Sequence, residues 1–400
     1  MTAWSVDQVA ASSAARAGPS PGRAVRTRGG PAAGLGVRAG MGCSVGMGPS
    51  FTRAAHRSCH FPGRAGHDDG MNEHGHEHEH ETGAAGFGED AGARERPGPR
   101  RVAVAGASGL IGEALTRSLR ADGHAVVRLV RRATRAEDEA RWDPEGGDVD
   151  TAALAGCDTV VNLAGAGIGD HRWTDAYKRT IRDSRVLGTA TLADAVASLD
   201  RRPEVFVCGS AIGYYGDTGA RAVDESAAPG EGFLPDVCVD WEEAAGAARE
   251  AGVRTVFART GLVVARGGGA WGRLFPLFKA GLGGRIGNGR QYWSFIALHD
   301  HVAALRHLID TPTLEGPFNL TAPEPVDNRE ITAAMGRVLH RPTPFPVPAP
   351  ALRLALGEFA GDILGSQRVL PRRLLDSGFP LRLPPAGRGD RRRRYGAEGP

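Results

Sequence analysis

The feature that most constrains this chain is the segment VAVAGASGLIG at residues 102–112. An apolar, β-branched run ends at Gly106, and Gly109 and Gly112 follow directly before a helical pattern. The first glycine of such a triad permits a tight turn, the second lets the backbone approach a pyrophosphate, and the third lets the helix pack closely on the sheet. Because a strand and a helix flank the triad, we predict a dinucleotide-binding turn rather than a plain strand–turn–helix.

From residue 101 onward, strand-like and helix-like patterns alternate. Strand-like runs cover residues 102–106, 125–132, 157–165, 204–210 and 254–264, and helical patterns cover 110–123, 174–199 and 233–252. This alternation predicts an α/β fold of the Rossmann type, a doubly wound parallel sheet that binds its ligand at the carboxyl ends of the strands. Residues 265–345 are irregular and rich in Gly and Pro, which indicates a smaller C-terminal lobe that covers the substrate. Residues 348–384 are expected to form a terminal unit with two helical segments.

The composition changes abruptly near residue 100. Residues 1–100 are rich in Ala, Gly, Arg, Ser and Pro and show no hydrophobic period, so they cannot bury enough surface to offset the entropy of ordering. We expect a disordered extension or a start codon placed too far upstream, with Met71 as the true start. The Arg-rich composition up to His67 also resembles a transit peptide. The tract HGHEHEH at residues 74–80 has no preformed geometry, so we predict no metal site, only adventitious binding.

Several classes of protein are disfavoured. The net charge of +3 is too small to indicate a nucleic-acid partner. No stretch approaches the roughly 18 apolar residues that a membrane span needs. The five cysteines include no CxxC pair, and Cys157 and Cys208 lie in apolar runs, which indicates reduced thiols in a cytoplasmic protein. We expect a small-molecule partner, no nucleic acid and no membrane, and the oligomeric state is not indicated.

The second strand-like run ends in Arg131 and Arg132. An acidic residue at this place accepts the adenosine ribose hydroxyl, whereas an arginine pair suits a 2′-phosphate by charge and bidentate geometry. No Asp or Glu follows until Glu137. We therefore predict NADP as the cofactor, the alternative being two exposed arginines. The run VVNLAG places the small residues Ala164 and Gly165 beside the cofactor, unless that strand end merely needs small residues.

Residues 101–323 resemble an extended short-chain dehydrogenase/reductase of the nucleotide-sugar epimerase/dehydratase superfamily. The resemblance rests on GASGLIG, VVNLAG, GSAIGYYGD, FARTGLVV and the HD pair at 299–300. More narrowly, the chain is similar to the subgroup called epimerase family proteins. That subgroup's marks are WDP at 142–144, RW at 172–173, SR at 184–185, DWE at 240–242 and GPFNLTAPEPV at 316–326.

The resemblance implies a division of the chain. Residues 1–100 have no counterpart, and residues 101–323 would be the NADP-binding domain. Residues 324–384 would form the subgroup's C-terminal domain of unknown function, on the similarity of LGSQRVLPRRLLDSGF at 364–379. Residues 385–400 would be a solvated basic tail.

The resemblance also implies cofactor contacts outside the glycines and arginines. In the turn they fall on Ser108, Leu110 and Ile111, and at the end of the third strand on Leu163. Further contacts fall on Thr180, Arg185 and Val263. Thr180 and Arg185 are expected on one side of a helix near the cofactor's phosphate or ribose, with a surface salt bridge as the alternative for Arg185. Val263 is expected near the nicotinamide.

The family's catalysis rests on a Ser or Thr and on Tyr-x-x-x-Lys, whose Lys lowers the pKa of the Tyr. Ser210 matches the serine, but no Tyr-x-x-x-Lys follows it. Two registers place either Phe233 and Val237 or Cys238 and Glu242 at these positions, and neither supplies a phenol and an ammonium. We therefore expect any activity to be slow and to depend on Ser210.

Water or Tyr214 would supply the proton, although a packing role is the alternative for Tyr214. Other candidate proton carriers are Tyr215, which follows Tyr214, and three residues of the next helix, Cys238, Asp240 and Glu242. Packing is also the favoured role of Trp241. Three functions remain open. The first is an NADP-dependent oxidoreductase or epimerase-like enzyme whose substrate is a small molecule, with nucleotide sugars among the candidates. The second is a non-catalytic NADP-binding sensor or regulator, and the third is a metal-handling protein that uses the His tract.

Overall fold

The computed structural model describes residues 98–265 and 268–381, which all fall within one compact unit. The expected disordered extension, the His tract and the basic tail lie outside the described residues.

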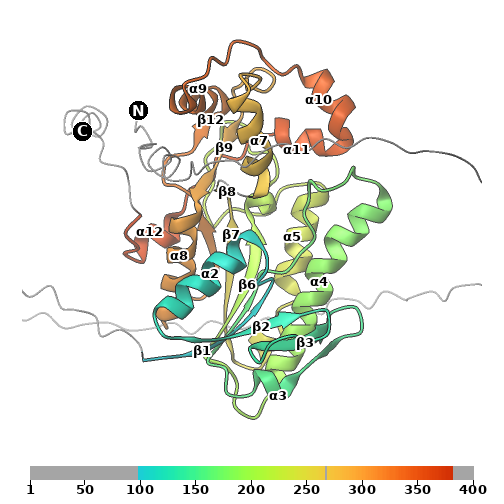
Figure 1. The fold of residues 1–400 in the computed structure, drawn as a ribbon, viewed down its shortest axis with the longest axis vertical. Coiled ribbons are helices and arrows are strands. Elements are labelled where there is room, and N and C mark those ends of the chain that lie inside the picture. Colours follow the sequence, from blue (N-terminus) through green and yellow to red (C-terminus); the bar gives the residue numbers. More distant parts are fainter. Residues whose placement is uncertain (1–97, 266–267, 382–400) are drawn as a thin grey trace, which may run out of the picture. The chain divides into compact units, whose positions relative to one another are not determined.

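A parallel sheet forms the centre of the described unit (Figure 1). Each neighbouring pair of strands is parallel except the last, which is antiparallel. Following the chain, strands are added first on one side of β1 and then on its other side. This reversal of strand order confirms the predicted doubly wound, Rossmann-type sheet. In spatial order the strands are β11 (Gly316–Leu320), β7 (Arg254–Thr260), β6 (Val205–Ala211), β5 (Thr159–Asn162), β1 (Arg101–Ala105), β2 (Ala125–Val130), β3 (Glu139–Asp143) and β4 (Asp148–Val149).

Helices cover both faces of this sheet (Figure 1). Val102 and Val104 of β1 face one core, and Ala103 and Ala105 face the other, because successive side chains of a strand point to opposite faces. The first face is covered by α2 (Leu110–Ala121), α8 (Leu298–Asp310) and α12 (Arg372–Asp376). The second is covered by α3 (Thr151–Leu154), α4 (Asp175–Ser198), α5 (Phe233–Glu243) and α6 (Gly246–Glu250).

The predicted strand at 254–264 is interrupted at Gly261, and β8 (Leu262–Val264) follows β7. A Cβ at Gly261 would lie 2.8 Å from the carbonyl oxygen of Ser294, so the chain bends where another backbone approaches closely. The predicted helix at 233–252 is likewise divided into α5 and α6.

The expectation of an irregular segment over residues 265–345 is wrong in part. This stretch contains three helices, α7 (Gly269–Lys279), α8 and α9 (Asn328–Leu339), and it supplies β11 of the main sheet. Short pairs of strands, β10 (Phe295–Ala297) with β8 and β12 (Val326–Asp327) with β9 (Tyr292–Trp293), complete the lobe. The frequent Gly and Pro residues hide these elements because they interrupt the hydrophobic period.

The terminal unit has three α-helices, not the two that were expected. They are α10 (Ala349–Leu356), α11 (Ala360–Leu364) and α12, with a 3₁₀ turn, η2 (Gly357–Phe359), between the first two. Leu374 and Phe379 join the core under α2 and α8, so the end of this unit packs on the main sheet.

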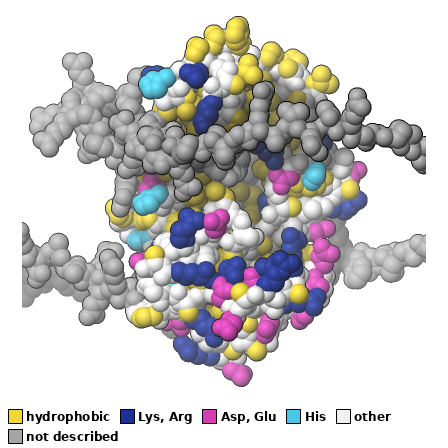
Figure 2. All heavy atoms as spheres, viewed as in Figure 1, with side chains coloured by type: hydrophobic (Ala, Val, Ile, Leu, Met, Phe, Trp, Pro, Cys, Tyr) yellow, Lys and Arg dark blue, Asp and Glu magenta, His cyan; other side chains and the backbone are white. Residues whose placement is uncertain are grey.

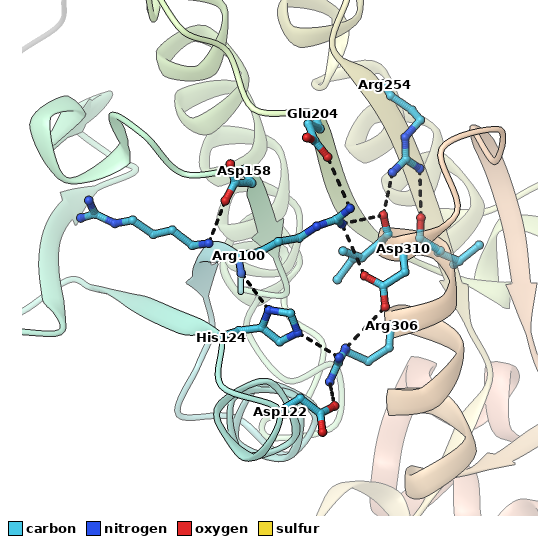
Figure 3. Close-up of polar contacts among 11 residues, drawn as sticks. Arg100, Asp122, His124, Asp158, Glu204, Arg254, Arg306 and Asp310 are labelled. Atoms are coloured by element: carbon cyan, nitrogen blue, oxygen red, sulfur yellow. Dashed lines mark hydrogen bonds and ion pairs between the residues drawn. The ribbon is translucent and has the colours of Figure 1, made fainter. Parts of the chain in front are cut away.

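A charged cluster ties together the amino ends of the strands (Figure 3). The N–H of Arg100 donates to Nδ1 of His124 at 3.0 Å, and the guanidinium of Arg100 lies 3.5 Å from Glu204 and 3.4 Å from Asp310. Arg254 donates to carbonyl oxygens at the end of α8. Arg100, His124, Glu204 and Arg254 precede or begin β1, β2, β6 and β7, and Asp310 ends α8. The cluster therefore lies at the edge of the sheet opposite the one where these strands end.

The face of the molecule drawn in Figure 2 has a hydrophobic region and a charged region. Figure 2 shows hydrophobic side chains gathered at the top of the view, where Figure 1 has α9 and α10, and acidic and basic side chains mixed below. The exposed large hydrophobic side chains include Leu282 after α7, Phe345 between α9 and α10, and Leu354 of α10. None of the helices in residues 98–265 and 268–381 is long and apolar enough to cross a membrane.

Candidate functional site

The glycine-rich turn between β1 and α2 has the geometry that the sequence predicts. Gly106 adopts a φ of 78°, which favours glycine, and a Cβ there would lie 2.7 Å from the carbonyl carbon of Leu163. A Cβ at Gly112 would lie 2.1 Å from the oxygen of Gly106, so only glycine allows this approach. Gly109 is the N-cap of α2 and provides no side-chain cap for the first-turn N–H groups. The tight turn and the close packing are confirmed, and phosphate contacts at Ser108, Gly109, Leu110 and Ile111 stay predictions.

The two arginines after β2 are not equivalent. Arg132 donates from Nη1 and Nη2 to the carboxylate of Glu139 at 2.8 and 2.6 Å. The side chain of Glu139 is 2% exposed and also accepts the N–H of Arg135 at 2.8 Å. These contacts, that of Arg132 first, lower the pKa of Glu139 to about 2. Arg131 is exposed and has no hydrogen-bond or ion-pair partner within the described ranges.

No Asp or Glu lies between Arg132 and Glu137, as the sequence shows, but the later residue Glu139 occupies one arginine of the pair, Arg132. Glu139 lies seven residues after Arg132 in the chain. The chain returns between them so that β3 pairs in parallel with β2, which brings Glu139 to the arginine. The free guanidinium at this strand end belongs to Arg131.

The end of β5 lies against the glycine turn. The N–H of Leu163 donates to the oxygen of Ala105 at 3.0 Å, and the N–H of Ala164 donates to Oδ1 of the buried Asn162 at 3.1 Å. Asn162 also donates from Nδ2 to Thr189 of α4 at 2.9 Å. These contacts bring the predicted residues 163–165 beside Gly106.

Arg185 of α4 lies against this strand end. Its guanidinium carbon would be 3.2 Å from a Cβ at Gly165 and lies 5.1 Å from the ring centre of Trp241. Nη1 donates to the oxygen of Ile181 at 2.9 Å, and burial lowers the pKa of the guanidinium. No carboxylate of the described residues pairs with Arg185, so the alternative of a surface salt bridge is wrong. A half-buried cation without a counter-ion suits an anionic ligand, and the contact of Arg185 with the cofactor stays a prediction.

Thr180 does not share the side of α4 that carries Arg185. Five residues correspond to about 140° around a helix at about 100° per residue. Thr180 is exposed, and its hydroxyl donates to the oxygen of Ala176 at 3.2 Å. The expectation of one shared side is wrong, and a cofactor contact at Thr180 stays a prediction.

A buried polar network joins the ends of β6, β7 and β11 with α5. Ser210 donates to Oε1 of Glu242 at 2.7 Å, and Arg259 donates to both oxygens of Glu242 at 2.8 Å. Nη1 of Arg259 donates to the hydroxyl of Tyr215 at 2.9 Å, and that hydroxyl donates to Oδ1 of Asn319 at 2.8 Å. Burial acts to lower the pKa of Arg259, but the contacts with Glu242 outweigh it and raise the pKa. Burial also raises the pKa of Tyr215 to about 12.

This network shows which register of α5 faces the end of β6. Cys238 lies with Sγ 3.7 Å from the oxygen of Ala211, and Glu242 bonds to Ser210. Phe233 and Val237 pack instead with Trp173 in another cluster. The register of Cys238 and Glu242 therefore faces the strand, and burial raises the pKa of the Cys238 thiol to about 12.

The two predicted catalytic residues differ in how they are held. The hydroxyl of Ser210 is committed to Glu242, and the residue is 3% exposed. Tyr214 is half-buried in the 3₁₀ turn η1 (Ile212–Tyr215), with the guanidinium of Arg259 3.5 Å from its ring centre. Its hydroxyl has no partner within the described ranges. Trp241 is buried and packs under Gly209, as its favoured role predicted.

Val263 is half-buried in β8, in register with Ile296 of β10. It packs at the edge of the core that includes Val102. Its contact with a nicotinamide stays a prediction.

Sequence reasoning named Glu242 as a candidate proton carrier but did not pair it with Arg259, and it gave no role to Arg259 or Asn319. A signal was present in FARTGLVV, because a charged residue inside an apolar strand requires a buried counter-ion. The distance in sequence hid the identity of that counter-ion.

Comparison with known families shows to which family this chain belongs. The family model described as NAD dependent epimerase/dehydratase family matches residues 102–320, more than half of the chain. The chain belongs to this family. A second model, a domain of unknown function called DUF1731, matches residues 347–384 of this family member.

Relatives confirm the predicted subgroup. Epimerase family protein Mb2239 of Mycobacterium bovis is 50% identical over 279 residues, which cover 70% of this chain and 92% of that protein. Epimerase family protein SDR39U1 of Bos taurus is 36% identical over 292 residues, covering 72% and 97%. A crystal structure of human SDR39U1 with NADPH matches with a TM-score of 0.67 at 33% identity, covering 71% of this chain and 95% of that one.

Proposed function

We propose that this chain is an NADP-dependent oxidoreductase or epimerase-like enzyme of the extended short-chain dehydrogenase class. The observation that carries the proposal is the turn after β1, where Gly106 and Gly112 leave no room for a Cβ and α2 begins without a side-chain cap. Such a turn admits a pyrophosphate to backbone N–H groups. The NADPH in the related human protein supports the choice of cofactor.

The residues present fit a dinucleotide. The turn would hold the pyrophosphate, Arg131 would meet the 2′-phosphate, and Arg185 would neutralise a phosphate or contact a ribose beside Gly165. Glu139 would keep Arg132 in place at the edge of the adenosine site. Residues 101–323 would form this binding domain, and residues 324–384 the terminal domain.

The bound cofactor would supply hydride transfer, and the chain would supply orientation and protons. The substrate would be a small molecule, with nucleotide sugars among the candidates. Near the end of β6, the phenol hydroxyl of Tyr214 has no hydrogen-bond partner among the residues that the structure describes. Ser210 remains a proposed catalytic residue, but its hydroxyl must leave Glu242 to polarise a carbonyl.

The test is a pair of binding titrations with NADPH and NADH on the parent protein and on Arg131→Ala. The parent should prefer NADPH, and the variant should lose most of that preference. A charge-assisted contact is worth roughly 1.5–3 kcal/mol, or about 10- to 150-fold in affinity. Arg201→Ala, which removes an exposed arginine at the amino end of the sheet, is the matched control and should change nothing. Equal affinities in the parent would contradict the proposal.

A further inference from the structure

The connecting segment, residues 365–371, joins α11 to α12 and bonds both to the loop after η1 and to the end of β11. In that loop, Val223 donates its N–H to the oxygen of Arg368 at 2.9 Å and accepts the N–H of Leu370 at 2.8 Å. From β11, Nδ2 of Asn319 donates to the oxygen of Leu370 at 3.0 Å. Leu370 therefore ties the terminal domain both to the loop after η1 and to the main sheet.

The bond to Leu370 determines which way the amide of Asn319 faces. An amide offers donors on its nitrogen and an acceptor on its oxygen. Since Nδ2 meets the carbonyl of Leu370, Oδ1 is the atom that faces the hydroxyl of Tyr215, which donates to it at 2.8 Å. That hydroxyl has a single proton, so it acts as the acceptor for Nη1 of Arg259, which lies 2.9 Å away. Asn319, Tyr215 and Arg259 are at most 3% exposed, so bulk water does not compete for these bonds.

The chain of bonds that begins at Asn319 ends at the ring of Tyr214. Nε and Nη2 of Arg259 donate to the two oxygens of Glu242, and Nη1 donates to Tyr215, so the planar guanidinium is held on two edges. Its Cζ lies 3.5 Å from the ring centre of Tyr214, within the range of a cation–π contact. The ring of Tyr214 also meets that of Tyr215 at 80°, with centres 5.2 Å apart. Both contacts of this ring therefore depend on residues that Asn319 holds.

Tyr214 is connected directly to the candidate site. It follows the end of β6, the strand that carries Ser210, and Glu242 accepts both from Arg259 and from the hydroxyl of Ser210 at 2.7 Å. The hydroxyl of Tyr214 itself has no hydrogen-bond partner among the described residues. The contacts of its ring, and not a bond at its phenol, therefore orient Tyr214.

We propose that Asn319 is a positioning residue, through which the connecting segment of the terminal domain holds Tyr214 as the proton donor of the site. This inference rests on the proposed function. As hydride is transferred from the nicotinamide to the substrate's carbonyl carbon, the π electron pair of the C=O bond moves onto oxygen. That oxygen takes the phenol proton of Tyr214, and the phenolate regains a proton from water. The carbonyl of Leu370 contributes by fixing the order of donors and acceptors from Asn319 to Arg259.

The first test follows NADPH oxidation by the full chain with para-nitrobenzaldehyde as the probe, in a double-mutant cycle of Asn319→Leu and Tyr214→Phe. Asn319→Leu should lower kcat by up to roughly 10²-fold, because a displacement of about 1 Å at a catalytic group can cost that much. KM and the affinity for NADPH should stay nearly unchanged. In the Tyr214→Phe chain, Asn319→Leu should lower kcat no further. Losses that multiply in the double variant would overturn the inference and leave the proposed function intact.

The second test does not depend on turnover. Tetranitromethane nitrates the tyrosine rings that it reaches, and peptide mass spectrometry locates the product. Tyr214 should be nitrated several-fold faster in Asn319→Leu than in the parent, because a released guanidinium no longer covers its ring. Tyr215→Phe removes the same link with little change of volume and should have the same effect. Rates equal to that of the parent in both variants would overturn the inference.

A matched control separates positioning from a general loosening of the fold. Asn328 is also a buried amide, 2% exposed, and its Oδ1 accepts the N–H of Ile286 at 2.7 Å, away from Tyr215 and Arg259. Asn328→Leu should leave both kcat and the nitration rate of Tyr214 as in the parent. Changes as large as those of Asn319→Leu would overturn the inference.

A conservative variant tests the part played by the connecting segment. Asn319→Asp keeps an acceptor for Tyr215 but cannot donate to Leu370, so Tyr214 should be nitrated as fast as in Asn319→Leu. A rate equal to that of the parent would show that the connecting segment is not required and would overturn the inference. Absence of turnover in the parent despite NADPH binding would contradict the proposed function, whereas the nitration rates decide the positioning of Tyr214 in either case.

Discussion

At the scale of single residues, burial decides which groups can titrate. His301 of α8 is fully buried, and its Nε2 lies 3.0 Å from the hydroxyl of Thr260. Nδ1 has no partner among the described residues. Burial lowers the pKa of His301 from 6.5 to about 4, so the ring is neutral in the folded protein at neutral pH.

This burial predicts a loss of stability in acid. The pKa is about 4 when folded and 6.5 when unfolded, so the unfolded chain binds more protons between these values. The free energy of unfolding should therefore fall as the pH drops from 6.5 towards 4, by up to about 3 kcal/mol. The free energy of unfolding, measured with urea across this pH range, should fall less for His301→Gln, whose amide can still bond to Thr260. The exposed neighbour variant, His299→Gln, should behave as the parent does, and equal slopes in all three proteins would refute the assignment.

At the scale of elements, the ion pair between Glu242 and Arg259 holds α5 to the ends of β6 and β7. The two side chains are 13% and 4% exposed, and Ser210 and Tyr215 bond to them. Removing one partner of a buried pair leaves an uncompensated charge, which costs more than the pair itself contributes.

Glu242→Gln should thus lower the free energy of unfolding by about 3–5 kcal/mol. Adding Arg259→Met in the same chain should recover much of that loss, because no charge is then left buried. Chemical denaturation of the single and double variants measures both effects. The matched control is Asp240→Asn on the same helix, which breaks an exposed pair with Arg182 and should cost at most about 1 kcal/mol. A cost for Glu242→Gln no larger than that of Asp240→Asn would contradict the role of the network.

At the scale of the whole molecule, the charged cluster at the amino ends of the strands determines how far the N-terminus can be shortened in a chain that still folds. Arg100 precedes β1, yet it contacts His124, Glu204 and Asp310 from three separate elements. A shortened chain must therefore retain Arg100 to keep these connections.

A chain beginning at residue 98 should fold and bind NADPH as the full chain does, because no earlier segment has a core-forming pattern. A chain beginning at residue 101 should melt at a lower temperature, since the contacts of Arg100 are lost. Melting curves and NADPH titrations of the three lengths measure this. Aggregation of the chain from residue 98 beside a stable full chain would show that the first 97 residues are required.

Elements built from local pattern were predictable from the sequence. The strands β1, β2, β5, β6 and β7 follow from runs of apolar residues, whereas β3 and β4, which are short and polar, were not predicted. The turn at Gly106 and Gly112 follows from glycine spacing, because steric limits on the backbone act between near neighbours. The expected position of a ligand site, at the carboxyl ends of the parallel strands, also follows from the βα alternation and stays a prediction.

Tertiary structure decided how the charged groups are paired. Glu139 pairs with Arg132 because β3 lies in parallel beside β2. Glu242 meets Arg259 because α5 packs beside β6 and β7. Most of the sheet and its glycine-rich turn were specified by local sequence, since these depend on local sterics and hydrophobic period. Only the folded chain determined which ionisable groups are buried, paired or free, because burial and Coulomb energy depend on distances between segments far apart in sequence.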